Sequence, residues 1–345
     1  MKMKAKTLLL TFIWLSMVSC STKVDLYTGF KDATIVYGVL DVAQDTSFIK
    51  ITRAFSGSND ESFDAFEIAQ IADSLNYPGK LDARFVELKS VQGNSYAPTG
   101  REIILDTITI HNKQEGTFYS PNQKLYYTTA RLKVNSGSEK YRYRLTVNKS
   151  TDTITSEIGL LGGSNFQIRT EMVKFTSENS TKKGKIYFTP DDNGGIYQVN
   201  LQFNYKEVHA GQNPVIRNVS WTLGSFSLMD LGYENGAYFV TYPENALFTE
   251  LSNAIGNDIY QVERFFISFD ISISAYGKEL YNYAQMNVPS VNGLLQSLSD
   301  YSYTNIEGGY GVFSSRYVLS KSVKMSSRTQ ADLMGMPWGF KNLGY

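Results

Sequence analysis

The feature that most constrains the fold of this chain is a two-residue alternation of apolar and polar side chains. Aromatic or aliphatic residues occupy every second position of residues 196–205, and the same pattern recurs in residues 141–147. Successive side chains of a strand point to opposite faces of a sheet, so each segment predicts a strand with one face on a core. The 24 tyrosines and 20 phenylalanines agree with this interpretation because aromatic residues are enriched in strands.

The order of these segments predicts a mainly β chain with two folded parts. Short strands between turn residues favour an immunoglobulin-like or fibronectin-like sandwich over residues 33–163, with a helical insertion where apolar residues recur at helical spacing in 63–75. Leu161-Gly162-Gly163-Ser164 is the expected boundary. Residues 164–345 are expected to form a larger β-rich domain with short helices, one of which has Pro243 near its first turn.

The first residues have the order of an export signal. Three lysines precede an apolar run from Leu8 to Leu15, which is too short to cross a bilayer as a stable helix. Met17-Val18-Ser19-Cys20 resembles the bacterial lipobox, although Met17 stands where Leu is usual. The resemblance implies cleavage before Cys20 and lipidation of its thiol. We therefore expect a signal peptide at residues 1–19 and a lipid anchor with its tether at residues 20–32.

Scarce residue types narrow the possible functions. Cys20 is the only cysteine, so disulfides and cysteine metal clusters are excluded within one chain. The chain has 33 basic and 33 acidic residues, and loss of the three signal lysines leaves a mature net charge of about −3. Nucleic-acid recognition rests on a concentrated basic face, so we expect no nucleic-acid partner.

Three further phrases carry a family resemblance. Residues 36–40, 49–55 and 305–313 resemble uncharacterised cell-envelope lipoproteins of Bacteroidota. Together with the lipobox, these segments are distributed over most of the chain, so the resemblance spans most of the mature protein. The resemblance implies a β-rich, lipid-anchored envelope protein, and it offers no catalytic residues to carry over.

The sequence provides no catalytic or cofactor motif. His111 follows a strand and His209 lies in a loop, and no G-x-S-x-G elbow supports a nucleophile. Residues 190–195 could offer oxygen ligands to Ca²⁺, but they lack the terminal glutamate of an EF-hand and favour a hairpin turn. The glycines of residues 307–311 have no following Lys-Ser/Thr, so they favour close backbone packing over phosphate binding. We expect no catalytic residue, no metal and no cofactor.

Aromatic residues leave a second functional interpretation open. Flat rings could stack on sugars, whereas alternating aromatics more often form half of a β core. The core interpretation is favoured here. The candidates for a sugar platform are Tyr126, Tyr127, Tyr141, Tyr143, Trp221, Tyr301, Tyr303 and Trp338.

Three short phrases resemble the O-glycosylation acceptor pattern of exported Bacteroidota proteins. They are Asp73-Ser74-Leu75, Asp106-Thr107-Ile108 and Asp152-Thr153-Ile154. The pattern is short enough to occur by chance, so the phrases mark candidates for modification and no more.

These observations favour a lipid-anchored envelope protein with a non-enzymatic binding or assembly role. Its expected partners are the membrane, through lipid on Cys20, and envelope proteins or glycans. A glycan-binding surface lipoprotein is the first alternative, and an envelope hydrolase is the least favoured. Ser21 in place of an aspartate argues against inner-membrane retention, so we expect the outer membrane. Only Asp25 supplies acidic character shortly after the cysteine, which leaves the membrane face open.

Overall fold

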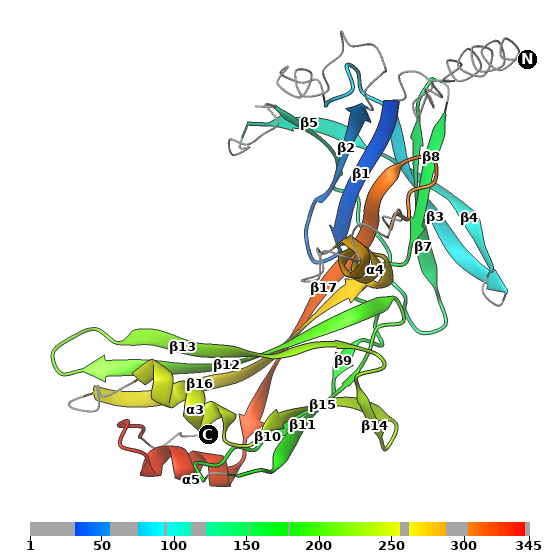
Figure 1. Cartoon of the computed structure of the whole chain (residues 1–345). Coiled ribbons are helices and arrows are strands. Elements are labelled where there is room, and N and C mark those ends of the chain that lie inside the picture. Colours follow the sequence, from blue (N-terminus) through cyan, green and yellow to red (C-terminus); the bar gives the residue numbers. More distant parts are fainter. Residues whose placement is uncertain are drawn as a thin grey trace, which may run out of the picture.

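The computed structural model describes residues 32–55, 75–92, 95–111, 122–150, 152–178, 180–255, 262–287 and 303–341. Within these residues strands dominate and three short helices accompany them, which confirms the expected mainly β fold (Figure 1). The signal, Cys20, the tether and nearly all of the helix expected at 63–75 lie outside the described residues.

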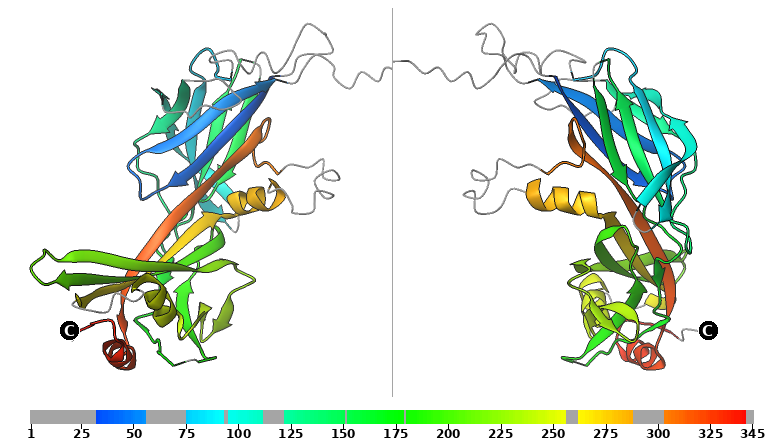
Figure 2. Two further views of the ribbon diagram at one scale, coloured as in Figure 1. Left: turned by 60° about the vertical axis from the view of Figure 1, so that its left-hand side comes forward. Right: turned by 90° about the vertical axis from the view of Figure 1, so that its right-hand side faces the viewer.

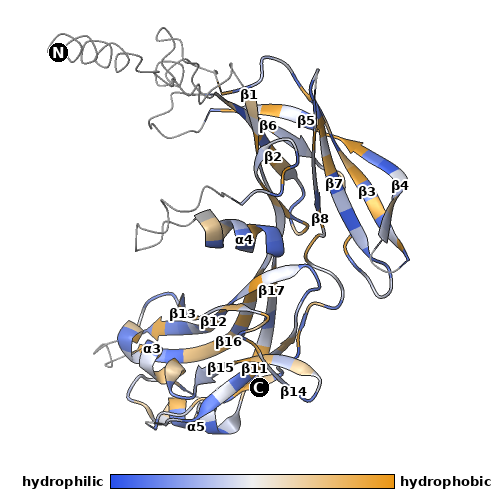
Figure 3. Ribbon diagram, turned by 45° about the vertical axis from the view of Figure 1, so that its right-hand side comes forward, coloured by the Kyte–Doolittle hydropathy of each residue, from blue (hydrophilic) through white to orange (hydrophobic). Residues whose placement is uncertain are grey.

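The N-terminal half is a sandwich of two sheets, as expected. Its strands alternate between buried and solvent-facing positions, and Figure 3 shows alternating blue and orange bands along them. One sheet has the order β4-β3-β7-β8, and the other contains β1, β2, β6 and β5. The strands are β1 (Asp32–Asp41), β2 (Ser47–Phe55), β3 (Asp82–Gln92), β4 (Ser95–Ile104), β5 (Asp106–Ile110), β6 (Gln123–Thr128), β7 (Tyr141–Asn148) and β8 (Thr153–Ile158).

The C-terminal half packs a large sheet against a smaller one and two helices. The small sheet has the order β14-β15-β11-β9, and β13, β12, β16 and β17 belong to the large sheet. The elements are β9 (Gln167–Ile168), β10 (Met172–Val173), β11 (Lys183–Thr189), β12 (Gly194–His209), β13 (Val215–Ser227), β14 (Gly232–Glu234), β15 (Ala237–Pro243), α3 (Ala246–Ile255), β16 (Val262–Gly277), α4 (Lys278–Asn287), β17 (Tyr310–Met325) and α5 (Ser327–Gly335).

Strand β17 belongs to both halves. Its residues 310–316 pair in parallel with β1, whereas its residues 316–323 pair antiparallel with β16. Both views of Figure 2 show this orange strand running from one half into the other. The result is a nine-stranded sheet with the order β13-β12-β16-β17-β1-β2-β6-β5, with β10 as a short addition on β17.

Two hydrophobic cores lie on the same side of the nine-stranded sheet. The first contains buried residues up to Leu160 together with Ile306 and Phe313, and the second begins at Leu161. Phe313 and Val323, both on β17, enter different cores. The C-terminal strand therefore supplies side chains to the sandwich as well as to its own half.

Two local expectations need correction. Residues 190–195 form a turn, but the strands on either side, β11 and β12, lie in different sheets, so the turn does not close a hairpin. The turn is fixed because the Asp191 carboxylate accepts backbone N–H groups from Gly162 and Gly163 at 3.0 Å each. Pro243 is the last residue of β15 and precedes α3, so it does not lie in the first turn of that helix.

Candidate functional site

The outer face of the nine-stranded sheet, opposite the two cores, carries an array of polar side chains, all but one of them uncharged. Cross-strand partners share a face, and the register places Gln202 beside both Ser220 and Asp270, with Ser322 next to Asp270. We call this array the polar ladder. It comprises Asn218, Ser220 and Thr222 of β13, Gln198, Asn200, Gln202 and Asn204 of β12, Ser268, Asp270, Ser272 and Ser274 of β16, and Ser320 and Ser322 of β17.

Hydrogen bonds connect the polar ladder across the strands. Thr222 Oγ1 donates to Asn200 Oδ1 at 2.6 Å, and the Ser272 and Ser320 hydroxyls are 2.8 Å apart. The ladder residues are half-buried or exposed. Hydroxyl and amide groups both donate and accept, so the face can exchange these bonds for bonds to a neutral polar ligand.

Asp270 is the single charged residue of the polar ladder, and its carboxylate accepts three hydrogen bonds from the ladder. It accepts from Asn204 Nδ2 at 2.6 Å, from Ser268 Oγ at 3.1 Å and from Ser322 Oγ at 2.5 Å. Charge-assisted hydrogen bonds from three fixed donors hold the Asp270 carboxylate in place.

A pocket of about 400 Å³ adjoins the ladder where β16 ends and α4 begins. Tyr276 lies two residues after Ser274 on the same face, so it connects the ladder to the pocket wall. Arg316 Nε and Asp41 Oδ2, 3.2 Å apart, form an ion pair at the rim. Aromatic and apolar walls with a few polar groups are typical of small-molecule sites. The lining residues are Val39, Asp41, Gln44, Thr46, Ser47, Phe48, Tyr276, Leu280 and Arg316.

Beyond the pocket, the outer face of β1, β2 and β5 exposes several large apolar side chains, and by register Lys50 and Asp106 lie among them. Tyr37, Val39, Phe48 and Ile108 are large exposed side chains there, between 38% and 45% accessible. The Tyr37 hydroxyl lies 3.4 Å from the hydroxyl of Tyr283 on α4. That hydrogen bond, with burial adding to it, raises the pKa of Tyr37 to about 12. The outer face thus exposes large apolar side chains in one half and mainly uncharged polar side chains in the other.

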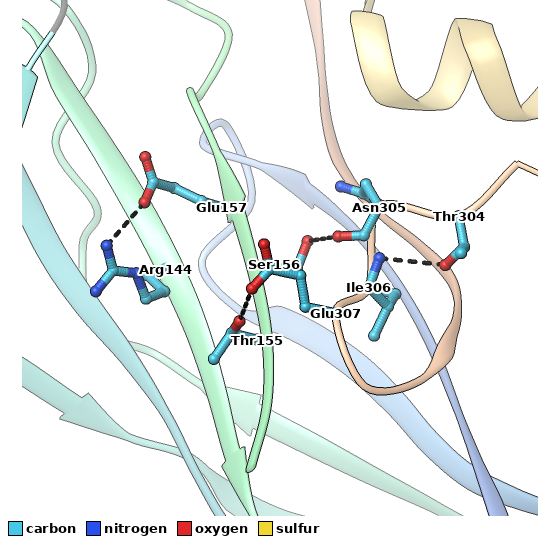
Figure 4. A pocket seen from close by; sticks show the side chains of 8 residues that line it. All are labelled: Arg144, Thr155, Ser156, Glu157, Thr304, Asn305, Ile306 and Glu307. Atoms are coloured by element: carbon cyan, nitrogen blue, oxygen red, sulfur yellow. Dashed lines mark hydrogen bonds and ion pairs between the residues drawn. The ribbon is translucent and has the colours of Figure 1, made fainter.

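A larger polar groove of about 640 Å³ lies along β8 (Figure 4). Its lining groups already bond to each other, since Thr155 and Glu307 exchange backbone hydrogen bonds and Ser156 Oγ donates to Asn305 O at 2.7 Å. Arg144 is paired with Glu157 at 3.1 Å. These bonds attach the segment before β17 to the edge of β8, so we interpret the groove as a contact between two parts of the fold.

The candidate histidines lie apart from each other. His111 follows β5 in the sandwich, and its Nδ1 lies 2.7 Å from Asn122 Oδ1. His209 is the last residue of β12 in the other half. In the described ranges no group of three His, Cys, Asp or Glu is placed to hold a metal ion.

The buried carboxylates Glu87 and Glu207 each have fixed cationic partners. Glu87 accepts from Arg101 at 2.8 Å, from Lys133 at 3.0 Å and from the Tyr143 hydroxyl at 3.0 Å. Glu207 pairs with the buried Arg264 at 3.0 Å. Both carboxylates are therefore held in ion pairs within the fold.

The aromatic residues proposed as a sugar platform belong mainly to the cores, which confirms the favoured interpretation. Tyr126 and Tyr143 are fully buried in the first core, whereas Trp338 is buried and Trp221 partly buried in the second. They do not form one strip. Tyr141 is also buried, Tyr127 and Tyr303 are half-buried, and Tyr301 lies outside the described residues.

The glycines of residues 307–311 allow a close backbone approach, as expected. Gly311 has a φ of 110°, and a Cβ on it would lie 2.0 Å from Val36 O on β1. Gly308 also has a positive φ, of 76°. Glycine is the residue that tolerates both conditions.

The lipidation and glycosylation candidates stay predictions. Cys20 and Asp73-Ser74 lie outside the described residues. Thr107 is half-buried on the edge strand β5, and Thr153 is exposed at the start of β8. No helix among the described residues has the length and apolar character that a membrane crossing needs.

Sequence reasoning missed the polar ladder, although its signal is present. Polar residues occupy every second position of residues 198–204 and 268–274, out of phase with the apolar core positions. Comparison with known proteins adds no assignment, because no protein-family model matches the chain and no curated protein matches it.

Proposed function

We propose that this protein is a lipid-anchored protein of the bacterial outer membrane with a non-enzymatic binding or assembly role. The lipobox-like order ending at Cys20 supports the anchor, and the loose resemblance to Bacteroidota envelope lipoproteins agrees with it. The observation that carries the binding role is the outer face of the nine-stranded sheet, where one solvent-facing surface combines the polar ladder with the adjoining pocket.

A hydrolase role has less support. Among the described residues, His111 and His209 occupy different halves, and the buried carboxylates Glu87 and Glu207 are held by cations. A general base needs a hydrogen-bond path to its substrate and an available lone pair. A binding surface accounts for the arrangement with fewer assumptions.

Labelling with palmitate tests the anchor. Wild-type protein should incorporate the label in a bacterial host that processes lipoproteins, whereas Cys20→Ala should incorporate none because the acceptor thiol is gone. Ser21→Ala is the matched control and should be labelled like wild type. Equal labelling of Cys20→Ala would refute the anchor. Protease treatment of intact cells then assigns the membrane face by whether the folded chain is cleaved.

Glycan binding is the second candidate, and the polar ladder favours it. Neutral sugars present many hydroxyl groups, so they match a face of hydroxyls and amides whose single carboxylate already accepts three hydrogen bonds. Tyr276 and Phe48 in the adjoining pocket supply aromatic rings beside the ladder. Both features lie on the same outer face.

A glycan array probed with the mature chain carrying Cys20→Ser tests this candidate. We expect a retained glycan whose binding weakens about tenfold in Gln202→Ala, since loss of one or two hydrogen bonds costs about 1.4 kcal/mol. Thr241→Ala is the control because Thr241 is exposed on β15, away from the ladder. An array without any retained glycan, or equal losses in both variants, would contradict glycan binding.

A further inference from the structure

Strand β13 is an open edge of the nine-stranded sheet. It is 13 residues long and pairs with β12 on one side. Within the described part of the chain, the sheet order places no strand on its other side. Figure 1 shows the β12–β13 hairpin projecting from the body. An open edge presents a row of N–H and C=O groups that can pair with another strand.

The other edges are short, covered or interrupted. β5 has five residues, while β9 and β14 have two and three. β8 is covered by the bridge between Thr155 and Glu307. β4 contains Pro98, and its pairing with β3 shifts register twice. These features are ones that proteins use to prevent edge-to-edge pairing, and β13 stands apart from them.

The composition of β13 also favours pairing. It contains neither proline nor lysine, and its single charged residue is Arg217. Arg217 Nε is already paired with Glu207 Oε2 on β12 at 3.1 Å. The register irregularity opposite Val199 and Asn200 leaves residues 215–222 as an unbroken stretch. Two such edges could therefore approach without like-charge repulsion.

We propose that β13 pairs antiparallel with β13 of a second copy of this chain. A two-fold axis perpendicular to the sheet produces this pairing and keeps equivalent faces together. Asn218 and Ser220 would then meet polar side chains of the second copy, while Val219 and Trp221 would meet apolar ones on the core side. The polar ladder would continue from one copy into the other, and this inference goes beyond the proposed function.

Sedimentation equilibrium of the mature chain with Cys20→Ser tests the pairing, because this variant carries no lipid and no thiol. We expect a dimer at tens of micromolar. Asn218→Lys with Ser220→Lys should raise the dimer dissociation constant at least tenfold, because like charges would oppose each other across the paired edges. Both residues are exposed, so the thermal unfolding midpoint should match that of the parent protein at dilutions where both are monomeric.

Ser320→Lys with Ser322→Lys is the matched control. These residues are exposed on the same face but lie on β17, which has strands on both sides. We expect this double variant to dimerise within about twofold of the parent protein. A monomeric parent protein, an unaffected dimer in the β13 variant, or equal weakening in both double variants would overturn the proposal.

Discussion

At the scale of single residues, Glu87 shows how a buried charge is kept in this β fold. Its side chain is 1% exposed, and Arg101 and Lys133 pair with it. Burial alone would raise the pKa of Glu87, but the hydrogen bonds from Lys133, Arg101 and Tyr143 outweigh it and hold the pKa below its ordinary value of 4.5. Because the folded pKa is lowered, Glu87 stabilises the protein above pH 4.5 and loses this effect as the pH falls through the folded pKa.

Glu87→Gln should therefore destabilise the protein in a pH-dependent way. We expect the free energy of unfolding at pH 7 to fall by about 2–3 kcal/mol. This is less than the usual cost of breaking a buried ion pair, because Arg101 and Lys133 are partly exposed and water can hydrate them. The loss should shrink below pH 4. Urea unfolding at both pH values measures it. A penalty that is the same at pH 7 and pH 3 would contradict the assigned ionisation.

At the scale of elements, β17 depends on glycine where it approaches β1. Gly311→Ala would combine strain at a φ of 110° with a Cβ placed 2.0 Å from Val36 O. Gly100→Ala is the control, since Gly100 has a φ of 86° and no atom within 4 Å of the added Cβ. We expect the free energy of unfolding, measured with chemical denaturant, to fall by about 1 kcal/mol in the control and by about 3 kcal/mol or more in Gly311→Ala. Similar losses in both variants would argue against the close approach.

Local patterns predicted most strands and the buried face of each, but not their partners. Alternation in residues 196–205 gives the inward residues of β12, and the same alternation contains the polar ladder. Nothing local indicates that β17 pairs with β1 and so joins the two halves, because that pairing links residues more than 250 positions apart. Helix α5 was also missed, although Ser326 caps it by accepting from Thr329 N. The turn at residues 190–195 has hairpin chemistry, yet its strands separate into different sheets.

At the scale of the whole molecule, the account depends on one continuous sheet that joins two cores. If β17 couples them, the halves unfold together and the outer face acts as one surface. The native tryptophans give a means of testing this coupling. Trp14 belongs to the expected signal, and Trp221 and Trp338 both contact the second core. Tryptophan fluorescence of the mature chain therefore reports on the C-terminal half.

The most direct measurement is urea unfolding of Phe85→Ala followed by tryptophan fluorescence. Phe85 is fully buried in the first core and stacks on Phe313 of β17 at 5.8 Å between ring centroids. Its removal should cost about 3–5 kcal/mol. We predict that the urea midpoint of tryptophan fluorescence, which reports on the second core, is lower in Phe85→Ala than in wild type, because weakening the first core weakens both. A fluorescence midpoint that stays unchanged, while circular dichroism shows a separate unfolding transition at lower urea, would contradict cooperative unfolding through a single sheet.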